Sequence, residues 1–94
     1  MAESFDVRDN PDASQFEVTV DGHLAVSQYR LGDGRIVFTH TEVPAELSGR
    51  GVGSALARAA LDQARERGLR VEPRCPFVAR YIERHPEYAD LVHE

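Results

Sequence analysis

The chain has 94 residues, of which 41% are hydrophobic and 29% charged, an ordinary balance for one small globular domain. Its net charge is −5, and all 11 basic residues are arginine. A net-acidic chain lacks the basic footprint that nucleic-acid binding requires, so no nucleic-acid partner is expected. The absence of lysine also excludes a P-loop lysine, a Schiff-base lysine and a lysine general base.

The charge is unevenly distributed along the chain. Residues 1–49 contain three arginines and nine acidic residues, whereas residues 50–94 contain eight arginines and seven acidic residues. If the protein binds an anionic ligand, we therefore expect it on the second half. The acidic first half either attracts a cationic amine or serves solubility alone.

The first residues do not have the pattern of a signal peptide. They have neither its basic n-region nor its apolar h-region, and no apolar run reaches the roughly 20 residues of a membrane span. We therefore expect a soluble, cytoplasmic protein with no membrane partner. Residues 1–14 are polar, with Asn10-Pro11-Asp12 as a turn signal, and predict a loosely ordered segment before one domain over residues 15–94.

Three strands are predicted next. Phe16–Val20 alternates apolar and polar residues, as a half-buried strand does, and Asp21-Gly22 is a hairpin signal. His23–Leu31 is the returning strand, Gly32-Asp33-Gly34 is a second tight turn, and Arg35–Val43 is a third strand rich in β-branched and aromatic residues. Together they predict an antiparallel meander.

The third strand changes character along its length. A period of two places Ile36, Phe38, His40 and Glu42 on one face, which is apolar at its start and polar at its end. Pro44 has no N–H to donate and ends the ladder.

Two helices and a fourth strand follow. Alanine-rich Val52–Arg67 predicts a helix that packs closely on a sheet, with Gly68 as its C′ residue. Leu69–Glu72 predicts a short strand. Pro76 suits the first position of a second helix, which His85-Pro86 ends because the residue before proline avoids the α region.

The element order is β-β-β-α-β-α, with one more helical turn expected over Pro86–Val92. The step from the third strand through the first helix to the fourth strand should be a right-handed parallel crossover. The predicted fold class is therefore α/β with a mixed sheet, an antiparallel three-strand meander followed by a helix, a parallel strand and a C-terminal helix.

A glycine-rich turn precedes the first helix. Its three alternate glycines are Gly49, Gly51 and Gly53. They remove Cβ atoms at a helix N-terminus, which permits close backbone approach and leaves N–H donors free. Because the helix dipole adds to these donors, the turn predicts an anion site, to which Arg50 and the hydroxyl of Ser48 or Ser54 add donors.

Three classes of ligand use such a turn, and some helices begin this way with no ligand. A Walker P-loop needs lysine, which the chain lacks. A Rossmann fingerprint needs a third glycine, but Leu56 or Ser54 stands at that position, depending on the register. Glu72 has the spacing expected of a ribose-binding acid. However, residues 44–48 separate the turn from the preceding strand, which the fingerprint does not allow. The pyrophosphate of coenzyme A is the third ligand.

The turn resembles motif A of the GNAT superfamily of N-acetyltransferases, Gln/Arg-x-x-Gly-x-Gly/Ala, over residues 48–53, with Ser48 in place of the usual Gln or Arg. From about Phe16 to Leu91 the chain is similar to the small GNAT-like family of single short domains. The segments that carry the similarity are Phe16-Glu17, Tyr29, His40-Thr41-Glu42-Val43-Pro44, Gly49-Arg50-Gly51-Val52-Gly53-Ser54, Cys75-Pro76-Phe77-Val78 and His85-Pro86-Glu87-Tyr88.

This resemblance implies an acetyl-CoA-dependent N-acetyltransferase whose acceptor is a small-molecule or protein amine. Acetyl-CoA would bind at a splay between the third and fourth strands, with pantetheine along the third strand and the pyrophosphate on the turn. The cofactor-binding residues that it implies are Glu42, Val43, Ser48, Gly49, Arg50, Gly51, Val52, Gly53 and Ser54. The spacing of histidines and the single cysteine predicts no metal site.

His40 and Cys75 are the candidate catalytic residues. His40 suits a general base because imidazole exchanges protons near neutral pH, and Glu42 could orient a substrate ammonium; alternatively, His40 is a half-buried strand residue bonded to a neighbour. Cys75 lies between Arg74 and a helix N-terminus, which both favour thiolate. It either relays the acetyl group as a thioester or lines the tunnel as a small buried residue.

Tyr81 resembles the tyrosine with which many GNAT enzymes protonate the CoA sulfur; alternatively, it is a core aromatic one turn from Phe77. Two other classes of function stay open. One is a non-catalytic acyl-CoA-binding or sensing module, since so short a chain has little material for an acceptor pocket. The other is an interaction module whose glycine turn is structural.

Overall fold

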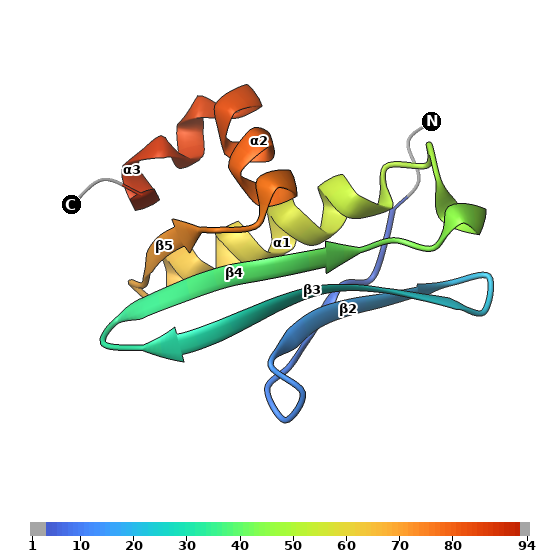
Figure 1. Ribbon diagram of the computed structural model, residues 1–94, viewed down its shortest axis with the longest axis horizontal. Helices are drawn as coiled ribbons and strands as arrows, with labels where there is room; N and C mark the ends of the chain where they lie inside the picture. The colour runs from blue at the N-terminus through green and yellow to red at the C-terminus, as the bar shows by residue number, and fades with distance from the viewer. Residues whose placement is uncertain (1–3, 93–94) are drawn as a thin grey trace.

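A computed structural model describes residues 4–92 (Figure 1). The strands are β1 (Arg8–Asn10), β2 (Gln15–Val20), β3 (His23–Gly32), β4 (Arg35–Glu42) and β5 (Arg70–Pro73). The α-helices are α1 (Val52–Glu66), α2 (Pro76–Arg84) and α3 (Ala89–Val92), and short 3₁₀ helices are η1 (Ala45–Leu47) and η2 (Pro86–Tyr88). The predicted α/β class with a mixed sheet is confirmed.

The five strands lie in the order β1-β2-β3-β4-β5. The first four pair antiparallel, and β4 pairs parallel with β5 across the α1 connection, as predicted. β1 lies in the segment expected to be loosely ordered. Its three residues are too few to show a periodicity, and the edge of β2 supplies the hydrogen bonds that order them.

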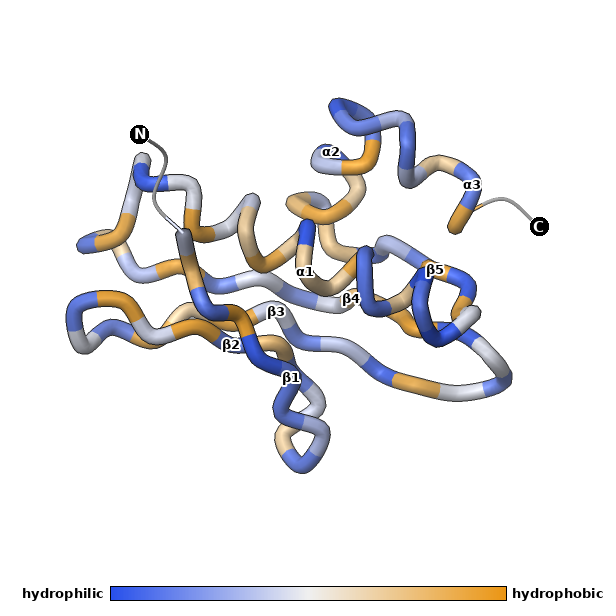
Figure 2. Tube along the Cα trace, turned by 180° about the vertical axis from the view of Figure 1, so that it is seen from behind, coloured by the Kyte–Doolittle hydropathy of each residue, from blue (hydrophilic) through white to orange (hydrophobic). Residues whose placement is uncertain are grey.

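The helices cover one face of the sheet (Figure 1). The core lies between that face and α1, α2 and α3, and its largest fully buried side chains include Phe16, Phe38, Leu56 and Leu61. Seen from behind, residues 4–7 run alongside α1 (Figure 2). Because every described helix packs on the same side, the other face of the sheet carries no helix between residues 4 and 92.

β4 contains one residue more than the stretch of β3 that it passes. Gln28 pairs with His40 while the next residue, Tyr29, pairs with Phe38, so Thr39 has no counterpart on β3. This is a β-bulge, in which two residues of one strand oppose one of the other. The Thr39 hydroxyl donates a hydrogen bond to the Gln28 carbonyl at 3.3 Å.

The bulge reverses the alternation of side chains along β4. Ile36 and Phe38 face the helices and are buried, whereas His40 and Glu42 point to the open face and are exposed. Thr41 takes the helix-facing position instead. The prediction that Ile36, Phe38, His40 and Glu42 share a face is therefore wrong, because a period of two holds only for an unbroken ladder.

Two buried tyrosines tie separate elements together. The Tyr29 hydroxyl donates to Asp9 Oδ1 at 2.6 Å, and Arg67 donates to Asp9 Oδ2 at 3.0 Å, which joins β3, β1 and the end of α1. The Tyr88 hydroxyl donates to Asp62 Oδ1 at 2.6 Å and fixes η2 on α1. These contacts attach β1 and η2 to α1.

None of the helices within residues 4–92 is both long enough and apolar enough to span a bilayer.

Candidate functional site

β4 and β5 pair over only half of β4. Their register ends with Phe38 opposite Pro73, and the Cys75 N–H then donates to the Phe38 carbonyl at 2.8 Å. β5 ends there while β4 continues to Glu42. The edge of β4 from residue 39 to 42 is therefore unpaired with β5, and such an edge can pair with an extended ligand.

The start of α1 lines a cavity of about 310 Å³ next to this edge, which is called the glycine cavity below. Gly49 and Gly51 have φ of 79° and 83°, a conformation that favours glycine. The first hydrogen bond into α1 runs from the Ala55 N–H to the Gly51 carbonyl at 3.0 Å. The N–H groups of the three residues before Ala55 therefore have no acceptor within the helix, and N–H groups of this kind can bind an anion.

Most of the predicted cofactor-binding residues line this cavity. They are Val43, Ser48, Gly49, Gly51, Val52, Gly53 and Ser54. Arg50 lines a neighbouring groove and makes an ion pair with Asp21 of the β2–β3 turn, at 2.7 Å. Glu42 lines neither space and points to the open face of the sheet.

Phe77 forms the far wall of the cavity. A Cβ added to Gly53 would lie 2.6 Å from the tip of the Phe77 ring, so only glycine at position 53 lets α1 and the start of α2 approach this closely. The ring is 42% exposed. No local sequence pattern marks Phe77 as a site residue, because the packing of α2 on α1 brings the ring here.

We expect Gly53→Ala to change stability differently in two backgrounds. Alanine is favoured over glycine in a helix by at most about 1 kcal/mol, but here its Cβ must displace the Phe77 ring. In the wild-type background, the gain in helix stability is therefore offset by the displacement of the Phe77 ring. In a Phe77→Ala background it should appear in full as a higher urea midpoint. An equal effect of Gly53→Ala in both backgrounds would contradict this contact.

Cys75 is buried at the start of α2. It is the N-cap residue, with extended φ and ψ of −75° and 123°, and is 3% exposed. Its sulfur lies 3.3 Å from Thr41 Oγ1 on the helix-facing side of β4. The neighbouring Arg74 forms an ion pair with Glu72, so part of its charge is already offset.

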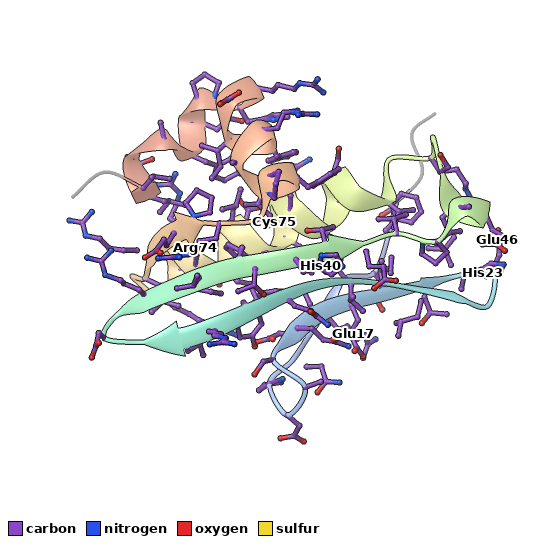
Figure 3. All side chains as sticks on the ribbon, in the orientation of Figure 1. Glu17, His23, His40, Glu46, Arg74 and Cys75 are labelled. Atoms are coloured by element: carbon purple, nitrogen blue, oxygen red, sulfur yellow. The ribbon has the colours of Figure 1, made fainter. Side chains whose placement is uncertain are left out.

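His40 lies on the other side of the same strand. Its Nε2 is 3.7 Å from Glu42 Oε1, and the two side chains are 58% and 72% exposed. Figure 3 shows His40 on β4 and Cys75 at the start of α2. The structure thus joins Cys75 with Thr41 and His40 with Glu42, and places the two pairs on opposite faces of β4 where it leaves β5.

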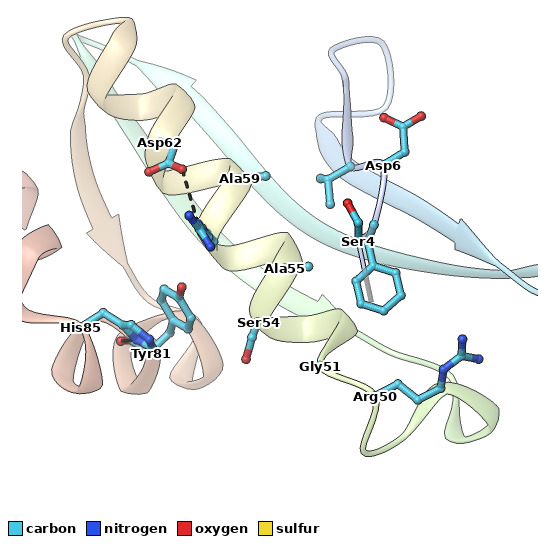
Figure 4. A pocket seen from close by; sticks show the side chains of 13 residues that line it. Ser4, Asp6, Arg50, Gly51, Ser54, Ala55, Ala59, Asp62, Tyr81 and His85 are labelled. Atoms are coloured by element: carbon cyan, nitrogen blue, oxygen red, sulfur yellow. Dashed lines mark hydrogen bonds and ion pairs between the residues drawn. The ribbon is translucent and has the colours of Figure 1, made fainter. Parts of the chain in front are cut away.

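A larger groove of about 670 Å³, called the outer groove below, runs over the outer surface of α1. Tyr81 and His85 lie on one side of α1, and Ser4 and Asp6 on the other (Figure 4). The Tyr81 and His85 rings stack with centroids 4.0 Å apart, and burial raises the pKa of Tyr81. Tyr81 therefore faces this groove and does not line the glycine cavity.

The floor of the groove carries charged side chains of a polar helix stripe to which sequence reasoning assigned no role. Arg58 lies one turn after Ser54 on α1, and its Nε is 4.0 Å from Asp62 Oδ2. Gly51 and Ser54 line both the groove and the smaller cavity. The spacing of four between Ser54 and Arg58 was the available signal, since it places both on one face of a helix. Among residues 4–92, no cluster of histidine, cysteine and carboxylate side chains could hold a metal ion.

The pairing of β4 with β5 ends halfway along β4, and the glycine-rich start of α1 lies beside the opening between the two strands. This arrangement is typical of an acetyltransferase-like α/β domain. Residues 15–91 match the family model of the GCN5-related N-acetyltransferases. The chain is 39% identical to Protein NATD1 of Gallus gallus over 84% of this chain and 74% of the relative, and 39% identical to Protein NATD1 of Homo sapiens over 77% and 66%.

A solved structure agrees with this match. A GCN5-like protein from Staphylococcus aureus superposes with a TM-score of 0.72 at 31% identity, over 92% of this chain and 85% of that one. The protein belongs to the GCN5-related N-acetyltransferase family.

Proposed function

We propose that the protein is an acetyl-CoA-dependent N-acetyltransferase that transfers an acetyl group to an amine. The observation that carries this proposal is the cavity in which the free N–H groups of a 15-residue helix converge beside the unpaired edge of β4. An anion site next to an open strand edge suits a ligand with a diphosphate and an extended amide-bearing arm. Acetyl-CoA has this form, and it supplies the acetyl thioester.

The glycine positions fit such a ligand. Gly49 and Gly51 have open space where a Cβ would stand, so the backbone itself can contact the diphosphate. The N–H groups of Val52, Gly53 and Ser54 would hold it, and the backbone near Glu42 and Val43 would pair with the arm. The nucleotide end would extend from Ser54 into the groove, toward the Arg58 guanidinium.

The two faces of β4 give His40 and Cys75 different roles in this proposal. On the open face, His40 accepts the proton that the acceptor amine must lose, and the Glu42 carboxylate beside it attracts the cationic acceptor. On the helix-facing side, Cys75 is the group at the sulfur site. If Cys75 relays the acetyl group, its sulfur forms a thioester as the original carbon–sulfur bond breaks and CoA leaves as a thiolate.

Substitution of Cys75 distinguishes a relay from a lining role. A thioester relay requires that Cys75→Ala abolish turnover. A variant that keeps near-normal turnover would show that Cys75 only lines the site and would leave His40 as the catalytic group.

The test of the proposed function is thermal unfolding with coenzyme A. A ligand at 100 times its dissociation constant stabilises the folded state by about 2.7 kcal/mol. For a domain of this size, that corresponds to a rise in Tm of roughly 10–20 °C. No shift at millimolar CoA would contradict the proposal. A shift without turnover on a polyamine or a lysine peptide would instead indicate a non-catalytic acyl-CoA-binding module.

A further inference from the structure

Ser27, Thr41 and Cys75 occupy successive positions on the helix-facing side of the sheet. Ser27 on β3 pairs with Thr41 on β4 in the sheet register, and both side chains face the helices. Directly paired residues on one face have Cβ atoms about 4.5–5.5 Å apart. The Thr41 hydroxyl in turn lies 3.3 Å from Cys75 Sγ. Ser27 is therefore the sheet neighbour of the residue that contacts the sulfur.

The hydroxyl of Ser27 has no partner. Ser27 is 1% exposed, and its Oγ makes no hydrogen bond. Buried hydroxyls are nearly always paired, because leaving one unpaired costs desolvation energy. The unpaired Ser27 hydroxyl would gain a partner if the neighbouring Thr41 hydroxyl turned its proton toward the Cys75 sulfur and accepted a bond from Ser27.

The direction of the hydrogen bond between Thr41 and Cys75 depends on whether the sulfur carries a proton. When Cys75 is a thiol, it can donate its proton to the Thr41 hydroxyl, and the Thr41 hydroxyl then needs no hydrogen bond from Ser27. A thiolate can only accept, so the Thr41 hydroxyl must turn to donate to sulfur, and its free lone pairs can then accept from Ser27. Each bond in such a chain strengthens the next.

We propose that Thr41 and Ser27 are positioning residues that stabilise the reactive, deprotonated form of Cys75 through a directed chain of hydroxyls. This inference rests on the proposed function for its biological role, because it concerns the sulfur site of that reaction. Its physical content concerns the thiol alone, so it can be tested in the protein without coenzyme A.

Other charged groups on the elements around Cys75 are already engaged or face away. On β5 and the following residue, Glu72 and Arg74 pair with each other, and on β4 His40 and Glu42 occupy the open face. Arg58 and Asp62 of α1 and Tyr81 of α2 line the outer groove. Thr41 is the polar side chain in contact with the sulfur.

The test measures the rate at which methyl methanethiosulfonate modifies the protein. The chain has a single cysteine, so intact-mass spectrometry follows Cys75 without interference. The thiolate attacks the reagent to form a methyl disulfide, and methanesulfinate leaves. Thr41→Val, which keeps the shape and removes the hydroxyl, should lower the rate near pH 7 about tenfold, because hydrogen bonds to charged groups are strong. Near pH 9.5, where free thiols are mostly ionised, the deficit should shrink to about twofold.

Three further variants separate this role from a structural one. Thr41→Ser should restore the rate near pH 7, and Ser27→Ala should lower it by a few-fold in the wild type but not in a Thr41→Val background. Thr19→Val is the matched control: it makes the same change at an exposed position of β2 and should leave the rate unchanged. A variant that merely opens the fold changes the rates near pH 7 and pH 9.5 alike.

The inference is overturned if wild-type Cys75 does not react, or if Thr41→Val reacts like the wild type near pH 7. It is also overturned if the deficit is the same at both pH values. None of these outcomes depends on whether CoA binds, so a failure here is distinct from a failure of the thermal-shift test.

Discussion

Gly51→Ala is expected to abolish the stabilisation of the protein by coenzyme A. Gly51 is the N-cap residue of α1 with φ of 83°, and it lines both the glycine cavity and the outer groove. An L-residue in this left-handed conformation costs about 1–2 kcal/mol, so the turn relaxes and the N–H groups at the start of α1 no longer converge. The rise in Tm with saturating CoA, expected to be roughly 10–20 °C for the wild type, should disappear.

Gly68→Ala is the matched control at the other end of α1. Gly68 has φ of 68°, and, as at Gly51, no atom lies within 4 Å of the position of a Cβ. Both variants should lower the urea midpoint by similar amounts, because the backbone penalty is the same. Only Gly51→Ala should lose the response to CoA. If Gly51→Ala keeps a full thermal shift, the diphosphate does not lie on this turn.

Raising the pH from 10 to 12 is expected to remove much of the stability of the fold. Burial, followed by the hydrogen bond to Asp9 and the charge of that carboxylate, raises the pKa of Tyr29 to about 12. Burial and the bond to Asp62 likewise raise the pKa of Tyr88 to about 12. An unfolded tyrosine titrates near 10, so below pH 10 each contribution is fully present, and it is lost as the pH rises through 12.

The expected loss is large for a small domain. A two-unit difference in pKa corresponds to about 2.7 kcal/mol per tyrosine, and small domains have only about 5–15 kcal/mol in total. Urea midpoints between pH 8 and pH 12 measure this loss. Tyr29→Phe and Tyr88→Phe should each lower the midpoint at pH 8, through loss of a bond to a carboxylate, and flatten the alkaline slope. A wild-type midpoint that stays constant from pH 10 to 12 would contradict both assignments.

Most of the framework could be predicted from the sequence because its signals are local. The alternation in β2, the Asp21-Gly22 turn, the alanine-rich periodicity of α1 and the Pro76 start of α2 each act within a few residues. The glycine-rich turn belongs to the same class, since positive φ at Gly49 and Gly51 follows from which residues tolerate it. These features determined the fold class and the place of the cavity.

Only the tertiary structure decided how the side chains are arranged where β4 continues beyond the end of β5. The bulge at Thr39 is a mismatch between two strands, and it moved His40 to the open face and Thr41 beside Cys75. Phe77 reached Gly53 only through the packing of α2 on α1. A periodicity reports how one chain segment alternates, whereas a register or a helix contact depends on which residues of a distant segment lie opposite. The sequence by itself therefore determined which residues are available for chemistry, and the tertiary structure decided which face of β4 each one serves.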